Sequence, residues 1–392
     1  MDQFTTAMLF ENVQIFLNHH AGTLFYRKIL DSTSLFKVTT KVSEADYSLS
    51  NYFLSRTNMS EESLMSTGCF SGYFGPENHE ANYFASASNS VTFDEDNNVT
   101  ALTPNSHCAV RRENGEIIDN TTPKTRRFYL SCKINNGFAL SMKPLPKLVN
   151  VRIVFYRSHA SRALLGCVKK AGSTTDFVEY PHKFIKIKSP ILHAYYIRSE
   201  YYDKKFSRNN ISKFRYDYPE YHVYRHILSD NVDHFQIPVA TGVLPRSIIF
   251  GIMKIEQFTG TLKRSSVDFK NMNLSSIDIQ VNNRSICHFP QKISGTYNCR
   301  DIFARFLKET LFYENQYTSG SLTYSQFKNY NFLITVDLER QNIFSGELEV
   351  TVKFKAPLTE KLFLVWMPIY QMKMTFDEEY TPSVEHSKAL TQ

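Results

Sequence analysis

The chain has 392 residues, of which 42% are hydrophobic and 21% charged, a composition typical of globular proteins rather than disordered ones. Its formal charge of +7 is modest for this length and does not by itself indicate a nucleic-acid partner. No apolar run approaches the ~18 residues of a membrane-spanning helix, and the six cysteines contain no CxxC pair, which argues against a zinc site or a disulfide-rich scaffold.

Aromatic residues favour strands over helices in this chain. There are 31 Phe and 23 Tyr against one Trp, and flat rings pack well on pleated sheets. We therefore expect an all-β fold.

The first predicted strand covers residues 13–18, VQIFLN, where apolar residues stand at positions 13, 15 and 17. A short amphipathic helix is expected over 25–30. From 43 to 125 the chain is rich in Asn, Ser, Glu and Thr, which predicts a long surface excursion. Alternation resumes at 149–155 and predicts another strand.

The second half repeats this order. The run Ile248–Met253 is typical of a strand buried on both faces, and residues 277–282, IDIQVN, alternate as VQIFLN does. A helix is expected over 299–307 because its apolar residues recur at helical spacing. Alternating residues at 332–338 and 348–354 and an apolar strand at 362–367 complete the predicted set.

Two copies of one barrel are therefore predicted. Strands of five to eight residues with long, uneven loops suit jelly rolls, and two unrelated β-sandwiches in series remain the alternative. We expect a first jelly roll over 1–205, including the excursion 43–125, a second over 206–382, and a tail at 383–392. Predicted strands at 221–228 and 247–253 precede Ile277, but only twelve residues precede Val13. The first barrel is thus expected to lack its opening strands.

The stretches LPRSIIFGIM (244–253) and DFKNMNLSSIDIQVNN (268–283) carry a family resemblance. They resemble the second-barrel motif of the double jelly-roll major capsid proteins of Polinton (Maverick) elements and adintoviruses. The resemblance implies a hexon-like structural protein, three copies of which form a pseudo-hexameric capsomer of an icosahedral shell. It also implies contacts with neighbouring capsomers and with penton and minor capsid proteins, in virions assembled inside a host cell.

Catalytic motifs are not found. The chain has no HExxH, no G-x-S-x-G and no Gly-rich phosphate loop, so we expect no enzyme activity, no catalytic residue, no cofactor and no metal site. The alternative function is a carbohydrate-binding or glycan-hydrolysing double β-sandwich. That function would need clustered acids or a calcium site on loops at one end of a barrel.

One segment carries most of the positive charge. Ten Lys and Arg and four acidic residues lie between Lys183 and His226, interleaved with eight tyrosines. Basic residues neutralise phosphates and aromatic rings stack on bases, which suggests nonspecific contact with packaged double-stranded DNA. The alternative is an inter-barrel connection in which Tyr rings pack and basic groups stay solvated. The candidate DNA-facing residues are Lys204, Lys205, Arg208, Lys213 and Arg215.

Overall fold

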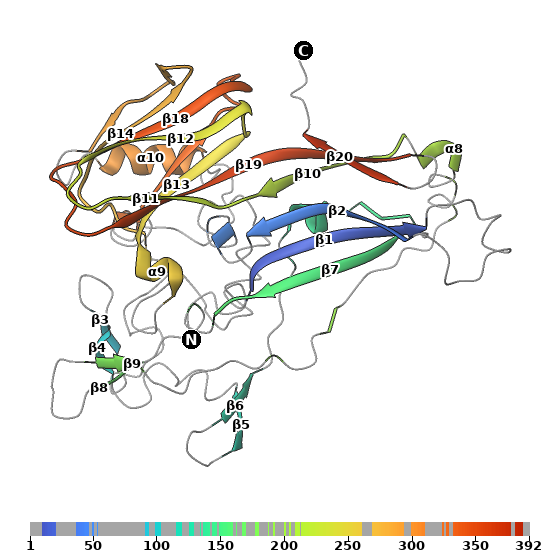
Figure 1. The fold of residues 1–392 in the computed structure, drawn as a ribbon, viewed down its shortest axis with the longest axis horizontal. Helices are drawn as coiled ribbons and strands as arrows, with labels where there is room; N and C mark the ends of the chain where they lie inside the picture. Colours follow the sequence, from blue (N-terminus) through green and yellow to red (C-terminus); the bar gives the residue numbers. More distant parts are fainter. Residues whose placement is uncertain are drawn as a thin grey trace.

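The structure is a computed structural model. It describes residues 10–20, 37–46, 213–260, 269–293, 299–309, 332–377 and 381–386, with short segments and single residues at 49–53, 91–128, 134–211 and 324–328. Antiparallel sheets make up most of the described part (Figure 1). The predicted all-β fold is confirmed, whereas the helix expected at 25–30 lies outside the described residues.

Two sheets form a jelly roll in the C-terminal half. One sheet places β11 beside β19, followed by β13 and β17, and the other has the order β12-β18-β14-β15, with β16 also paired to β14. From β11 to β14, and again from β17 to β19, each successive strand lies in the other sheet, as jelly-roll topology requires. The bounds are β11 Tyr224–Leu228, β12 His234–Val243, β13 Ser247–Lys254, β14 Leu274–Val281, β15 Arg284–Ser285, β16 Gln291–Lys292, β17 Leu333–Asp337, β18 Ser345–Phe354 and β19 Leu362–Phe376.

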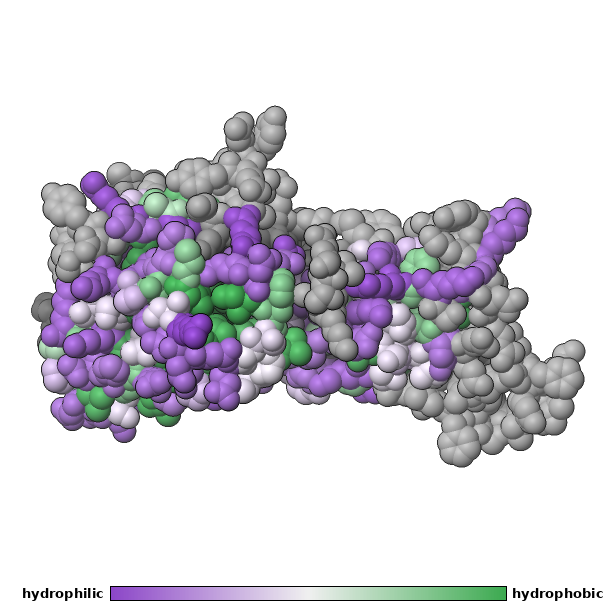
Figure 2. All heavy atoms as spheres, turned by 90° about the horizontal axis from the view of Figure 1, so that it is seen from above, coloured by the Kyte–Doolittle hydropathy of each residue, from purple (hydrophilic) through white to green (hydrophobic). Residues whose placement is uncertain are grey.

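The jelly-roll core follows the sequence pattern. Ile277, Ile279 and Val281 of β14 point inward, as their alternation predicts. In β13, by contrast, every residue from Ser247 to Met253 is buried. The helices α9 (Ile255–Thr259) and α10 (Cys299–Glu309) contact β13 and β17 respectively. This sheet therefore packs against helices as well as against the facing sheet. On the side shown in Figure 2, hydrophilic residues cover most of the described surface of this end, with apolar side chains between them.

A smaller core lies at the other end of the molecule. Its first layer is the sheet β2-β1-β7, formed by β1 (Phe10–His20), β2 (Lys37–Asp46) and β7 (Asn150–Arg157). Its second layer combines β10 (Arg215–Tyr221), the second half of β19 and β20 (Pro382–His386). Side chains from both layers form one buried cluster, which includes Ile15, Leu17, Val42, Tyr216, Tyr218, Met374 and Phe376.

The fifteen-residue strand β19 belongs to both cores. Its first half pairs with β11 and β13, and its second half pairs with β10 and β20. Leu362–Met367 therefore lie in the jelly-roll core, whereas Met372, Met374 and Phe376 lie in the smaller one. The division into 1–205 and 206–382 remains a proposal, but strands after residue 206 clearly supply one layer of the N-terminal core.

Two short helices stand beside this smaller core. α5 (Gly137–Leu140) is capped by the Asn136 side chain, which accepts from Phe138 N at 3.0 Å. Its backbone approaches β10 so closely that a Cβ on Gly137 would lie 1.7 Å from the carbonyl oxygen of Pro219. The other helix, α8 (Arg208–Ile211), directly precedes β10 and buries Ile211 in the same cluster.

The excursion predicted from residue 43 starts too early. Residues 43–46 belong to β2, and Ala45, Leu49 and Phe53 are buried. Ser43 is itself buried, and its hydroxyl donates a hydrogen bond to Asn136 Oδ1 at 3.1 Å, so this polar residue belongs to the strand and not to a loop. Further along, the chain forms two hairpins, with strands β3 (Val91–Phe93), β4 (Val99–Leu102), β5 (Gly115–Asp119) and β6 (Thr125–Phe128). A third hairpin joins β8 (Cys167–Lys169) to β9 (Phe177–Glu179).

The strand predicted over 221–228 is also corrected. It is broken at His222 and Val223, which separate β10 from β11. The backbone N–H of Val223 donates to Asp46 Oδ2 at 2.7 Å. The Asp46 side chain of β2 thus accepts the hydrogen bond of a backbone amide that, in a continuous strand, would pair with the neighbouring strand.

The predicted repeat is visible in the strand registers. In the N-terminal sheet Val13, Ile15 and Leu17 pair with Phe155, Ile153 and Val151. In the jelly roll Ile277, Ile279 and Val281 pair with Val352, Val350 and Leu348. The pair β1 and β7 therefore corresponds to the pair β14 and β18, residue for residue.

Candidate functional site

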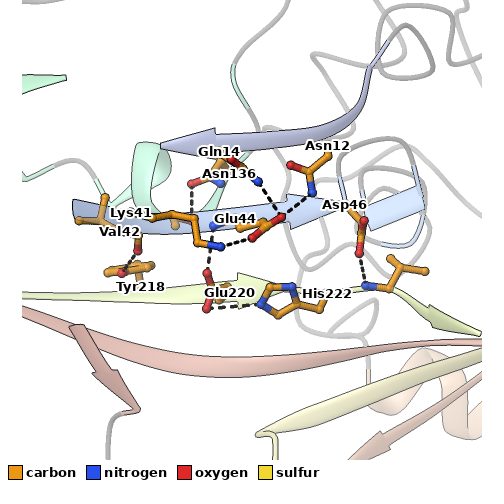
Figure 3. A network of polar contacts seen from close by, with 12 residues as sticks. Asn12, Gln14, Lys41, Val42, Glu44, Asp46, Asn136, Tyr218, Glu220 and His222 are labelled. Atoms are coloured by element: carbon orange, nitrogen blue, oxygen red, sulfur yellow. Dashed lines mark hydrogen bonds and ion pairs between the residues drawn. The ribbon is translucent and has the colours of Figure 1, made fainter. Parts of the chain in front are cut away.

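A network of polar side chains joins β2 to β10 (Figure 3). β10 buries Tyr216 and Tyr218 in the smaller core and β2 buries Val42 there, while polar side chains of the two strands meet at the margin between the layers. The network matters because β2 and β10 are far apart in sequence, and their contact fixes the N-terminal sheet to the strands of the C-terminal half.

Glu44 is the centre of the network. Its carboxylate accepts from Asn12 Nδ2 at 3.1 Å and from Gln14 Nε2 at 2.9 Å, and it also pairs with Lys41. Burial favours the neutral acid, but the hydrogen bonds from Lys41 and Gln14 outweigh it and hold the pKa of Glu44 below its ordinary value. Glu44 is therefore a charged anchor on the outer side of β1 and β2.

Glu220 connects β10 to this anchor. Its Oε1 accepts from the backbone N–H of Glu44 at 3.0 Å, and its Oε2 lies 3.5 Å from His222 Nε2. Burial lowers the pKa of His222, but the hydrogen bond and charge of Glu220 raise it by more, with help from Asp46 and Glu44. The net pKa of His222 is raised, so the imidazolium form stabilises this junction.

Asp46 ends the network beside β11. Burial raises its pKa, and the Val223 N–H and the His222 charge oppose that rise only in part. The guanidinium of Arg162 is also buried, which lowers its pKa, while the charges of Glu11 and Asp46 act in the opposite direction. The opposite charges of Asp46 and Arg162 therefore partly compensate each other at this buried contact.

Two kinds of feature are not found among the described residues. Within that part of the chain, no group of three or more His, Cys, Asp or Glu is placed to hold a metal ion. None of the helices described there is long and apolar enough to cross a membrane.

The candidate DNA-facing residues fall partly outside the described structure. Lys204, Lys213 and Arg215 are exposed, and Arg215 pairs with Asp217 at the start of β10. The backbone of Arg208 lies in α8, but its side chain and all of Lys205 lie outside the described residues. Lys204 is tied to α8 by a hydrogen bond from Asn210 Nδ2 to its carbonyl oxygen at 3.3 Å. The described members thus gather near one end of β10.

Three tyrosines of this segment are core residues. Tyr216, Tyr218 and Tyr221 are buried, and burial raises the pKa of each phenol. Tyr216 Oη donates to the Pro144 carbonyl at 2.7 Å, and Tyr218 Oη donates to the Val42 carbonyl. Tyr224 stacks on Trp366 with ring centroids 5.9 Å apart. The three buried rings are not available to stack on nucleic-acid bases.

Sequence reasoning missed the network between β2 and β10. Its members are separated by as many as 177 residues in the chain, so no local spacing brings them together. One signal was present, since RYDYPEY (215–221) alternates aromatic with polar residues, as a half-buried strand does.

Comparisons with known proteins give a distant likeness. No family model and no curated protein matches the sequence. Among solved structures, the mavirus major capsid protein is 12% identical with a TM-score of 0.29, over 45% of this chain and 42% of that one, less than half of its length. PBCV-1 VP54, fitted into a cryo-EM reconstruction of the virophage Sputnik, is 9% identical with a TM-score of 0.42. The match covers 98% of this chain and 86% of that one. A quasi-atomic model of the PBCV-1 virus capsid is 6% identical with a TM-score of 0.36, and the match covers 98% of this chain and 85% of that one.

Proposed function

We propose that this chain is a viral major capsid protein, related to those of Polinton elements and adintoviruses. The observation that carries the proposal is the position of the family-like residues. LPRSIIFGIM and LSSIDIQV include β13 and β14, one strand from each sheet of the jelly roll, and supply buried residues to its core. The motif therefore coincides with the framework of the fold.

The architecture suits a structural shell protein better than an enzyme. Packed sheets give a rigid body, and loops at their ends can vary without disturbing the strands. In the proposed assembly three copies form a hexon-like capsomer, and capsomers contact one another, pentons and minor proteins in the virion. No step of this function needs a cofactor or a reacting side chain.

The test is the size of the purified protein, measured by light scattering coupled to size-exclusion chromatography and by negative-stain microscopy. We expect a trimer, or larger particles built from trimers, in the absence of any sugar. A monomer that binds defined glycans on an array would overturn the proposal and support a carbohydrate-binding sandwich instead.

A further inference from the structure

Both residues of one Asn–Gly pair are fixed by the fold. Asn136 is fully buried beside β2 (Figure 3), where its Oδ1 accepts from the Ser43 hydroxyl at 3.1 Å and from Phe138 N at 3.0 Å. Gly137 follows it, and a Cβ at this position would lie 1.7 Å from the Pro219 carbonyl oxygen. The side chain of the first residue and the missing side chain of the second are therefore both needed to join α5 to β2 and β10.

Asn–Gly is also the sequence at which an asparagine side chain reacts most easily with its own backbone. The glycine nitrogen attacks Cγ of the asparagine and loses its proton to water, a C–N bond forms, and Nδ2 leaves as ammonia. Water then opens the resulting succinimide ring at one of its two carbonyls, which gives aspartate or isoaspartate. A Cβ on the second residue would hinder the attack, and glycine has none. Water is the only other reactant.

The folded backbone keeps the reacting atoms of this pair apart. The ring closes only when Gly137 N eclipses Cβ of Asn136, whereas the observed ψ of 134° turns that nitrogen away from Cβ. Rotation about this bond would displace Gly137 from its close contact with Pro219 and disrupt the start of α5. The reaction therefore requires α5 to open, and its rate depends on the population of open chains.

The two products differ in whether they can rebuild the contact. The cap of α5 uses Oδ1 of Asn136, whose Nδ2 has no hydrogen-bond partner among the described residues. Aspartate keeps a capping oxygen. Isoaspartate instead carries the main chain through Cβ and Cγ, which lengthens the backbone by one carbon and removes the capping side chain. The longer backbone shifts Gly137 where Pro219 leaves no room even for a Cβ.

We propose that Asn136–Gly137 is a deamidation site that distinguishes open chains from folded ones. In the open chain Asn136 is converted through the succinimide to isoaspartate, and the altered chain does not re-form the contacts of α5 with β2 and β10. In the folded chain the same pair is protected. The inference concerns a covalent modification and does not depend on the proposed capsid function.

The experiment compares the full chain in urea with the full chain in native buffer, at the same mildly alkaline pH and temperature. Samples are digested without refolding, and mass spectrometry with fragmentation measures conversion at Asn136 and distinguishes it from Asn135. The second Asn–Gly pair of the sequence, Asn114–Gly115, is the internal control in urea, where both pairs should react at similar rates. In native buffer Asn136 should react at least about a hundredfold more slowly than in urea.

Ser43→Ala tests whether the contact with β2 supplies the protection. The variant loses the hydroxyl that donates to Oδ1 of Asn136, so its deamidation in native buffer should be about fivefold faster than that of the wild type. Its rate in urea should be unchanged. The matched control is Ser345→Ala, which removes an exposed hydroxyl from β18 and should change neither rate.

A second measurement follows the products through refolding. The wild type is aged in urea and diluted into native buffer, and the soluble fraction is separated by size-exclusion chromatography. Isoaspartate at position 136 should be depleted at least about fivefold in this fraction relative to the starting material. Aspartate at the same position should not be depleted. The comparison of rates in urea and native buffer requires no refolding and tests the protection by itself.

The inference fails if Asn136 stays intact in urea while Asn114 reacts. It also fails if Asn136 reacts equally fast in urea and in native buffer, because the fold would then give no protection. An unchanged native rate in Ser43→Ala would contradict the role of the contact with β2. Equal proportions of isoaspartate in the refolded and starting material would show that the fold accommodates the longer backbone.

Discussion

Ile279 shows how far the pattern of single residues determines the core. It is fully buried and lies opposite Val350 of β18, and its neighbours Asp278 and Gln280 lie on the other face of β14. Period-two alternation is enough to predict this orientation, because a strand has only two faces. The same reasoning predicted the inward side chains of β1 and β18.

Ile279→Asp should prevent the jelly roll from folding. An unpaired carboxylate in this core is expected to cost about 4 kcal/mol or more, and soluble expression should be lost. Ser276→Asp is the control, because Ser276 lies on the outer face of the same strand opposite Lys292 and Lys353. A wild-type yield of the Ile279 variant would show that the register of β14 is different.

His222 gives the junction a pH dependence. Its pKa is raised above the ordinary 6.5 in the folded chain, so the folded state binds the proton more tightly than the unfolded state. The stabilisation is complete below pH 6.5 and is lost as the pH rises through the folded pKa. For this partly exposed pair we expect less than about 1 kcal/mol.

Thermal unfolding of the wild type and of His222→Gln, measured between pH 6 and pH 9, tests this contribution. The wild type should lose more stability than the variant as the pH rises. Glu44, whose lowered pKa acts only at acidic pH, should not affect this range. Parallel pH profiles for the two proteins would contradict the assignment.

Elements were predicted less completely than residues. The apolar run 362–367 predicted only the first part of β19, because Pro368 follows it and a proline normally interrupts a central strand. In the structure Pro368 pairs with Ile248, and the strand continues with Met372, Met374 and Phe376 facing the smaller core. β10 was not predicted as a core strand, because its buried residues are tyrosines that lie among basic residues in the sequence.

Gly137→Ala tests the contact between α5 and β10. A Cβ at this position would overlap the Pro219 carbonyl oxygen, which belongs to the backbone and cannot rotate away. We expect a loss of about 3 kcal/mol in the free energy of unfolding, measured in urea. Ala139→Ser changes an exposed residue of the same helix and should be neutral.

At the scale of the whole molecule, the basic residues before and within β10 are proposed to contact DNA. Because a shell cannot align with particular bases at every site, such contact would be weak, nonspecific and strongly salt-dependent. Changing Lys204, Lys205, Arg208, Lys213 and Arg215 to Ser should leave trimers intact and flatten the salt dependence of DNA retention.

A control variant removes the same number of positive charges from exposed positions of the jelly roll, Arg284, Lys292, Lys353, Lys355 and Lys361. It should retain the wild-type salt slope in filter-binding measurements. If both variants behave like the wild type, the segment is an inter-barrel connection that packs through its tyrosines.

The continuity of β19 across both cores limits how this gene can evolve. Recombination near codon 206 would give a chimaera whose new N-terminal sheet must fit β10, the second half of β19 and β20, all encoded downstream. Exchange of either half alone therefore produces mismatched layers. We expect the two halves to be inherited together and to diverge by compensating substitutions across β2 and β10, rather than by shuffling of modules.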